Sequence, residues 1–342
     1  MLQSFIMKIT QKTLISTTII LLLLILVSCD FPDNSIKRTE RSGLYFDTYI
    51  SITLYDTDDV KCADEALKIC EKYDNLFSTS KIGSDIYNIN SAGTDPVHVD
   101  KDTCEMLELA QAFSNSCPDY FDLTIYPVSK LWDFHNADGF IPDSNDIKEA
   151  VQYVNFNDFS VDSKSQTVTK SNPDVQIDAG AVAKGYIADK LKEYLQSCQI
   201  TKAVINMGGD LSIIGSKTNN SGFKIAIKNP NSDNDVLESL ELSDICVATS
   251  GIYERCFEQN GKLYHHILDP HTGYPADTDI MSVSIISDSS AYCDMICTAC
   301  IVMGLDNAMN YIENNPNIEA IILDTDGKLH YSGGIDKYLI KQ

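Results

Sequence analysis

Residues 178–205, DAGAVAKGYIADKLKEYLQSCQITKAVI, carry the pattern from which the fold class follows. Small residues open the stretch, and apolar residues at helical spacing predict an amphipathic helix over 178–196. A short buried strand is predicted at 203–205, and it leads to the glycine pair Gly208 and Gly209. A helix followed by a strand is therefore expected at the centre of the fold.

Strands and helices mix along the rest of the chain without a strict βαβ rhythm. Apolar residues at helical spacing predict helices over 61–77, 102–114 (with Asp102 or Thr103 as N-cap) and 294–304. Period-two or short apolar runs predict strands at 50–54, 223–227, 283–285 and 318–323. We therefore expect an α+β fold with mixed sheets and packed helices, rather than a doubly wound parallel sheet.

Composition limits the possible partners. The 342 residues include 26 Lys+Arg and 49 Asp+Glu, for a formal net charge of −23, and 44% are hydrophobic. That hydrophobic fraction excludes wholesale disorder. The acidity argues against nucleic acid, whose phosphates need a basic surface. A phosphate-bearing ligand would have to be met by a metal ion, a helix N-terminus or one placed lysine.

The N-terminus resembles a bacterial lipoprotein signal. Lys8 and Lys12 precede an apolar run over 14–27, and the run ends in Ser28-Cys29. The pattern predicts a signal peptide over 1–28, a lipid (palmitate type) on Cys29, a polar tether over 29–41 and a catalytic unit over 42–342. An ordinary cleaved signal and an uncleaved anchor are the alternatives. Asp30 favours the inner membrane, so we expect the chain in the cell envelope, on the periplasmic side.

The cysteines show no disulfide framework. Eleven are present, ten of them after Cys29, and their spacings are irregular. Most lie among apolar residues, as Cys62 and Cys70 do, and are predicted to be small core hydrophobes.

Two glycine-containing segments are candidates for binding an anion. In residues 178–186 the small residues would allow a ligand to approach a helix N-terminus, and Lys184, about two turns along, could reach a phosphate. Asp178 could cap the helix or accept a hydrogen bond from a ligand. Residues 206–210, Asn-Met-Gly-Gly-Asp, would form a tight turn after a strand. A plain capped helix and a plain turn are the structural alternatives.

Three histidines lie close together in sequence. His265 and His266 precede the turn sequence of residues 269–273, Asp-Pro-His-Thr-Gly, and His271 is part of it. A zinc site is disfavoured because adjacent residues of a strand point to opposite faces. A single catalytic or ligand-orienting histidine, His266, is the preferred interpretation.

The segment 293–300 contains Cys293, Cys297 and Cys300 at a spacing that some iron–sulfur enzymes use. On a helix the same spacing is a core stripe, which we favour. That helix also places Asp294 and Thr298 one turn apart on one face. A carboxylate with a hydroxyl is a ligand pair suited to Mg²⁺, although a solvated Asp beside a helical Thr is the simpler alternative.

Taken together, the segments resemble the ApbE family of bacterial flavin transferases (FAD:protein FMN transferases). The matching segments occur in order, at 46–48, 76–79, 121–124 with 131–132, 178–189, 206–210, 248–251, 266–273 and 294–298. The resemblance implies a single T-fold-related, α+β catalytic unit.

The resemblance also assigns roles to individual residues. The metal ligands it implies are the carbonyl of Ala181 and the side chains of Asp294 and Thr298. His266 corresponds to a candidate catalytic base, supported by the ordinary pKa of histidine near neutrality. Residues at flavin-contacting positions are Phe46, Tyr120, Phe121, Asp122, Asp178, Lys184 and Leu268.

Three residues depart from the family pattern. Ser80 stands where many relatives have an aromatic residue, so stacking on the flavin ring would be weaker. Tyr120 stands where a small residue is common. Cys297 replaces a further metal-binding residue, which disfavours a second metal.

The resemblance implies Mg²⁺-dependent transfer of FMN from FAD to a threonine hydroxyl of an exported acceptor protein, with release of AMP. The acceptor would be a redox subunit of quinone-reductase or electron-transport type. Two alternatives stay open, an FAD pyrophosphatase that uses water as acceptor and a flavin-binding lipoprotein without turnover.

Overall fold

The computed structural model describes residues 37–134, 139–217, 221–232 and 235–340. The signal segment and Cys29 lie outside these residues. Residues from Arg38 onward cluster as one unit. Its first strand, β1 (Arg38–Tyr45), begins inside the stretch expected to be a tether. No helix in the described ranges combines the length and apolarity needed to cross a membrane.

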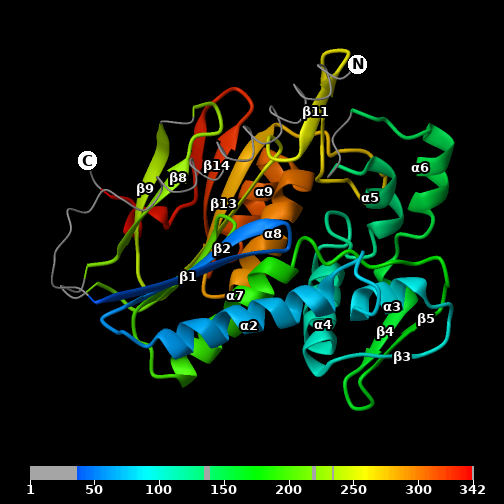
Figure 1. The fold of residues 1–342 in the computed structure, drawn as a ribbon. Coiled ribbons are helices and arrows are strands. Elements are labelled where there is room, and N and C mark those ends of the chain that lie inside the picture. The colour runs from blue at the N-terminus through cyan, green and yellow to red at the C-terminus, as the bar shows by residue number, and fades with distance from the viewer. Residues whose placement is uncertain (1–36, 135–138, 218–220, 233–234, 341–342) are drawn as a thin grey trace, which may run out of the picture. The chain divides into compact units, whose positions relative to one another are not determined.

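The largest sheet in this unit has eight strands and forms the centre of the fold (Figure 1). Its strand pairs are antiparallel throughout. In spatial order the strands are β1, β2 (Thr48–Tyr55), β6 (Ala203–Met207), β7 (Asp210–Ile214), β10 (Cys246–Gly251), β13 (Ile280–Ser287), β14 (Glu319–Asp324) and β15 (Leu329–Tyr331).

Alternate residues of the central strands face two different cores. Ala248, Val283 and Ile285 belong to the core under the helices, whereas Val247 and Ile286 face the opposite layer. The helical layer consists of α2 (Val60–Phe77), α7 (Ala183–Ser197), α8 (Ser290–Met303) and α9 (Leu305–Glu313). The opposite layer contains β8 (Phe223–Lys228), β9 (Val236–Leu242) and η2 (Ile335–Lys337).

A helix-rich segment lies between α2 and α7 in the chain. Trp132 anchors this segment, because its indole ring centroid lies 5.7 Å from that of Tyr264 and its N–H donates to the carbonyl of Gly273 at 2.8 Å. Tyr264 belongs to a hairpin of β11 (Cys256–Gln259) and β12 (Lys262–His265). The segment itself contains α3 (Asp85–Ser91), β3 (Val97–His98), α4 (Lys101–Ser116), α5 (Tyr126–Trp132), α6 (Ser144–Val151), η1 (Phe156–Asp158), β4 (Phe159–Asp162) and β5 (Thr167–Lys170).

The α+β prediction is confirmed, but the start of one helix was predicted wrongly. Helix α7 begins at Ala183, not at Asp178. The carboxylate of Asp178 accepts the Gly180 N–H at 2.9 Å, and this local hydrogen bond favours a turn over a helix. Lys184 is therefore the second residue of α7, instead of lying two turns along it. The N-cap of α4 is Asp100, not Asp102 or Thr103.

The prediction that the cysteines are small core hydrophobes is confirmed for the described part of the chain. All ten cysteines there are free, and most are buried. Cys293, Cys297 and Cys300 are fully buried between α8 and the sheet, where they pack as a core stripe.

Candidate functional site

Three charged side chains meet where α7, β7 and α8 come together. Lys184 donates through Nζ to the carboxylate of Asp210 and, at 3.4 Å, to Oδ1 of Asp294. The second oxygen of Asp294 accepts the backbone N–H of Gly185 at 3.3 Å. We call Lys184, Asp210 and Asp294 the charged cluster. Lys184 and Asp294 were predicted to be site residues, whereas Asp210 was not singled out.

The charged cluster depends on a close crossing of α7 and α8. A Cβ on Gly185 would lie 2.3 Å from the carbonyl oxygen of Ser290, so only glycine allows this approach. One turn further along α7, Asp189 accepts the N–H groups of Ser290 and Ala291 at 2.8 and 3.0 Å. These contacts hold the beginning of α8 against α7 and so place Asp294 beside Lys184.

A glycine turn places Asp210. Gly208 and Gly209 have φ values of 75° and 113°, which other residues rarely adopt. Oδ1 of Asn206 accepts the Gly209 N–H at 2.8 Å and closes the turn. Asp210 then begins β7, and its Oδ1 accepts the N–H of Thr249 at 3.2 Å. The sequence feature that could have identified Asp210 is its place directly after a glycine pair.

The charged cluster holds more negative than positive charge in a buried place. Asp210 and Asp294 are only 2% and 3% exposed, and they share one ammonium. Burial raises the pKa of Asp294 to about 6, and Asp210 adds to the rise while Lys184 opposes it. Burial alone would lower the pKa of Lys184, but the two carboxylates hold that pKa above its ordinary value. A further cation would relieve this imbalance.

The residues predicted to bind metal fit a hard cation. Thr298 is one turn from Asp294 on α8, and its Oγ1 lies 3.5 Å from the Asp294 carbonyl oxygen. Ala181 lies in the turn that leads into α7. Carbonyl, hydroxyl and carboxylate oxygens are the ligand types that Mg²⁺ prefers. Within the described ranges, no three His, Cys, Asp or Glu side chains group as a metal site.

Asp178, one of the residues predicted to contact flavin, is tied to the segment that follows Phe121. Its N–H donates to the carbonyl of Leu123 at 2.8 Å, which joins the 121–124 segment to the turn before α7. The Asp178 carboxylate also accepts the hydroxyl of Ser129 at 2.7 Å. No sequence motif pointed to Ser129. These contacts place Leu123 and Ser129 beside the turn that precedes α7.

The side chains of Tyr120, Phe121 and Asp122 have other partners. Phe121 is 4% exposed and packs edge-on against Phe113. Asp122 accepts the N–H and hydroxyl of Thr124 at 2.8 and 2.6 Å, and the N–H of Phe156 at 3.0 Å. Tyr120 lines a cavity of about 280 Å³ formed mainly with α9. Any ligand contact of Phe121 would therefore be made by its backbone.

Phe46 and Leu268 lie in two other parts of the fold. Phe46 is in the turn between β1 and β2, and its N–H donates to Oδ1 of Asp74 at 3.0 Å. Leu268 is 8% exposed and packs in the apolar cluster around Trp132.

His266 is a neutral imidazole, contrary to the expectation that it titrates near neutral pH. Its pKa is lowered from 6.5 to about 3, chiefly by burial and in part by the nearby charges of Arg255 and Lys184. Its Nδ1 is buried and has no partner among the described residues. His265 instead contacts the Ala276 carbonyl oxygen at 3.1 Å, and His271 lies 3.5 Å from Asp119. The three histidines therefore have different partners and do not form one site.

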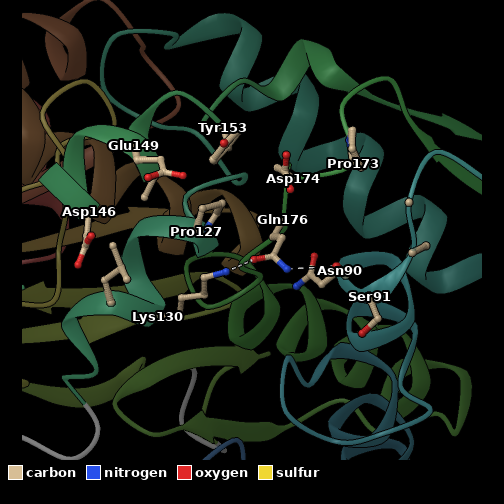
Figure 2. A pocket seen from close by; sticks show the side chains of 14 residues that line it. Asn90, Ser91, Pro127, Lys130, Asp146, Glu149, Tyr153, Pro173, Asp174 and Gln176 are labelled. Carbon is tan, nitrogen blue, oxygen red and sulfur yellow. Dashed lines mark hydrogen bonds between the residues drawn. The ribbon is translucent and has the colours of Figure 1, made fainter.

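A second cavity, of about 550 Å³, lies between α3, α5, α6 and residues 173–176 (Figure 2). Lys130 donates to Oε1 of Gln176 at 2.6 Å, and Gln176 donates to the carbonyl of Asn90 at 3.1 Å. None of the charged cluster lines this cavity.

Comparison with known proteins assigns the chain to a family. A model of the ApbE family matches residues 46–322, which include every candidate residue from Phe46 to Thr298. The chain belongs to the ApbE family. A relative from Klebsiella pneumoniae named FAD:protein FMN transferase is 34% identical over 286 residues, covering 82% of this chain and 88% of the relative. One of the same name from Treponema pallidum is 28% identical, covering 88% of each chain.

Solved structures of the ApbE family share the fold. The ApbE protein of Thermotoga maritima has a TM-score of 0.82 at 30% identity, covering 89% of this chain and 100% of the other. The flavin transferase ApbE of Vibrio cholerae has a TM-score of 0.80 at 25% identity, with the same coverage.

Proposed function

We propose that this chain is an FAD:protein FMN transferase, which moves FMN from FAD to a hydroxyl of an acceptor protein and releases AMP. The curated relatives that cover most of the chain carry this name. The observation that carries the proposal is the charged cluster, in which the buried acids Asp210 and Asp294 flank Lys184 at the start of α7. This arrangement suits a diphosphate ligand that arrives with a divalent cation.

The cation we propose is Mg²⁺, held by the Ala181 carbonyl, the Asp294 carboxylate and the Thr298 hydroxyl. When bound, Mg²⁺ would neutralise charge on the diphosphate of FAD. The buried carboxylate of Asp294 supports this assignment because, in the described part of the chain, the one cation that pairs with it is the Lys184 ammonium, at 3.4 Å. Asp294 would hold the metal, and Lys184 would then be available to a phosphate oxygen.

The start of α7 would bind the phosphates. The Ala183 N–H donates to the Ala179 carbonyl at 2.8 Å and the Gly185 N–H to Asp294 at 3.3 Å, so the helix start would attract an anion mainly through its dipole. Lys184, the second residue, adds a full positive charge at the same place. Asp178 would hold the preceding turn and the 121–123 backbone in position for the flavin.

The acceptor in this proposal is a threonine of an exported redox subunit. Its hydroxyl oxygen would form a bond to the FMN phosphorus while the bond to the AMP phosphate oxygen breaks. The hydroxyl proton would pass to His266, whose neutral imidazole has an unpaired Nδ1. This chain needs no nucleophile of its own.

The location we propose is the cell envelope, with a lipid on Cys29. The Ser28-Cys29 sequence after an apolar run supports it. Cys29→Ala should release the chain from the membrane fraction. Continued membrane attachment of Cys29→Ala would contradict the lipid anchor.

The test of function is incubation of the full chain with FAD and Mg²⁺, with and without an exported redox subunit. We expect AMP and covalently bound FMN on a threonine of that subunit, both absent with EDTA and restored by added Mg²⁺. Free FMN as the main product in both samples would indicate a pyrophosphatase. No AMP in either sample would indicate a binding protein.

A further inference from the structure

Two cysteines that are far apart in sequence meet where α2 begins and α7 ends. Cys62 is the third residue of α2, and Cys198 directly follows the last residue of α7. The two thiols are in hydrogen-bonding contact with each other, and both interact with the hydroxyl of Tyr194, one turn before Cys198. Both cysteines are free in this structure. We call Cys62 and Cys198 the thiol pair.

Aromatic contacts at the other end of the same two helices show that α2 and α7 are antiparallel. The ring centroids of Tyr73 and Phe77, late in α2, lie 6.0 and 5.9 Å from the centroid of Tyr186, early in α7. The two helices pack side by side (Figure 1). The start of α2 is therefore beside the end of α7, where the thiol pair lies.

Backbone hydrogen bonds hold both members of the thiol pair in place. Oδ1 of Asp59 accepts the N–H of Cys62 at 2.9 Å, and the carbonyl of Tyr194 accepts the N–H of Cys198 at 3.1 Å. A bond between thiols that the fold already brings together orders little more of the folded chain, whereas it removes entropy from the unfolded chain. That effect grows with the length of the closed loop, which here includes the helix-rich segment and α7.

Accessibility separates the thiol pair from the core stripe of Cys293, Cys297 and Cys300. Those three cysteines are fully buried, so an oxidant in solution does not reach them in the folded chain. Cys62 is also buried, but Cys198 is half-buried and open to solvent on one side. Burial raises the pKa of Cys62 to about 12, so Cys198 is the member that reacts first.

We propose that Cys62 and Cys198 are joined by a disulfide that stabilises the chain once it meets a disulfide donor. The Cys198 thiolate attacks one sulfur of the donor and forms a mixed disulfide, and the first donor thiolate leaves. The Cys62 thiolate then attacks Sγ of Cys198 and releases the second donor thiolate. The two protons that the cysteines lose end on the two donor thiols, so the chain is oxidised and the donor is reduced by the same two electrons.

The inference goes beyond the transfer reaction and does not depend on it. It uses the proposed location in the cell envelope, because disulfides persist outside the cytoplasm. The bond would lie at the end of α7 opposite Lys184, so the charged cluster would keep its geometry.

The test treats the full chain with glutathione disulfide, blocks the remaining thiols with N-ethylmaleimide in denaturant and digests it with trypsin without reduction. Tryptic peptides 62–68 and 193–202 contain one cysteine each, so a linked peptide identifies the bond. We expect this linked peptide, with a mass two hydrogen atoms below the sum of its parts. The melting temperature should be about 5 °C above that of the reduced chain.

Single variants test the order of the two steps. Cys62→Ser should keep glutathione as a stable mixed disulfide on Cys198. Cys198→Ser should leave Cys62 without glutathione, because that thiol is buried. Cys256→Ser, which alters another half-buried cysteine, on β11, is the matched control and should give the linked peptide like the parent chain.

Four results would overturn the inference. Recovery of both peptides only in the maleimide-blocked form would show that the thiols do not oxidise. A glutathione adduct that persists on Cys198 of the parent chain would show that Cys62 does not reach it. Linked peptides that join other cysteines instead would show unspecific exchange. Equal melting temperatures of the linked and reduced chains would remove the stabilising role.

Discussion

Asp122 and Asp294 were both predicted to be site residues, yet the fold treats them in opposite ways. Asp122 accepts three hydrogen bonds of 2.6 to 3.0 Å from Thr124 and Phe156, all from uncharged donors. Asp294 has one long contact with the Gly185 N–H, at 3.3 Å, and one with Lys184, at 3.4 Å. Asp122 forms all of these hydrogen bonds with nearby uncharged groups and so stabilises the local loop structure. Asp294 is buried with two long contacts, so its carboxylate remains available to a ligand.

The adjacent residues His265 and His266 show the same contrast. His265 is 3% exposed, and its Nε2 contacts the Ala276 carbonyl oxygen at 3.1 Å. His266 lies close enough to Lys184 for that charge to lower its pKa. The first imidazole connects β12 to the following segment, and the second lies within range of the charge on Lys184.

The largest effect is expected from Asp294→Asn. The amide keeps the size of the side chain but cannot serve as an anionic metal ligand, so transfer of FMN should fall at least about a hundredfold. Stability should change little, because the variant removes one of two carboxylates that share Lys184. Initial rates of AMP release and a thermal melt measure the two effects. Asp306→Asn, on an exposed part of α9, should retain full activity. Full activity of Asp294→Asn would contradict our view that Asp294, unlike Asp122, is available to a ligand.

The second prediction concerns Gly185, where α7 and α8 cross. Gly185→Ala places a Cβ against the Ser290 carbonyl, so α7 and α8 must separate and Lys184 must move from Asp294. We expect a loss of about 3 kcal/mol in the free energy of unfolding, with a loss of transfer activity. Gly93→Ala is the control, since its Cβ would meet nothing within 4 Å. Urea denaturation of both variants measures the difference, and equal stabilities would argue against the close crossing.

Sequence patterns located most elements but not the contacts between them. Helix α2 was predicted over 61–77 and is found at Val60–Phe77. The prediction succeeded because the apolar residues at helical spacing are those that the helix buries. The start of α7 was missed because the Asp178 side chain captures a backbone N–H, a competition that periodicity does not register.

One residue of the charged cluster was missed for a similar reason. Lys184 and Asp294 were named as site residues, whereas Asp210 appeared only as the last residue of the 206–210 segment and gains its role from a turn that brings β7 beside α7. The low pKa of His266 likewise comes from burial and neighbouring charges, which no single segment contains.

A smaller effect is expected from Asp122→Ala. Removing this carboxylate leaves the N–H of Phe156 and the groups of Thr124 without their acceptor, which should lower the free energy of unfolding by about 2 kcal/mol. Transfer activity per folded molecule should fall by less than about tenfold, unlike that of Asp294→Asn. Denaturation and AMP release measured on the same preparation separate the effects. A stable but inactive Asp122→Ala would reverse our assignment of the two residues.

The smallest effect concerns the pH dependence of stability through His265. Burial lowers its pKa in the folded chain from 6.5 to about 4. Between these values the unfolded chain binds a proton that the folded chain does not, so stability is lost as the pH falls from 6.5 towards 4. At about pH 5.5 the loss from this residue should be about 1 kcal/mol relative to neutral pH. His265→Gln can still donate to Ala276 but cannot titrate, so it should weaken the pH dependence by this amount. Exposed His98→Gln should not, and if His265→Gln also slows transfer at neutral pH, the division of roles between His265 and His266 is wrong.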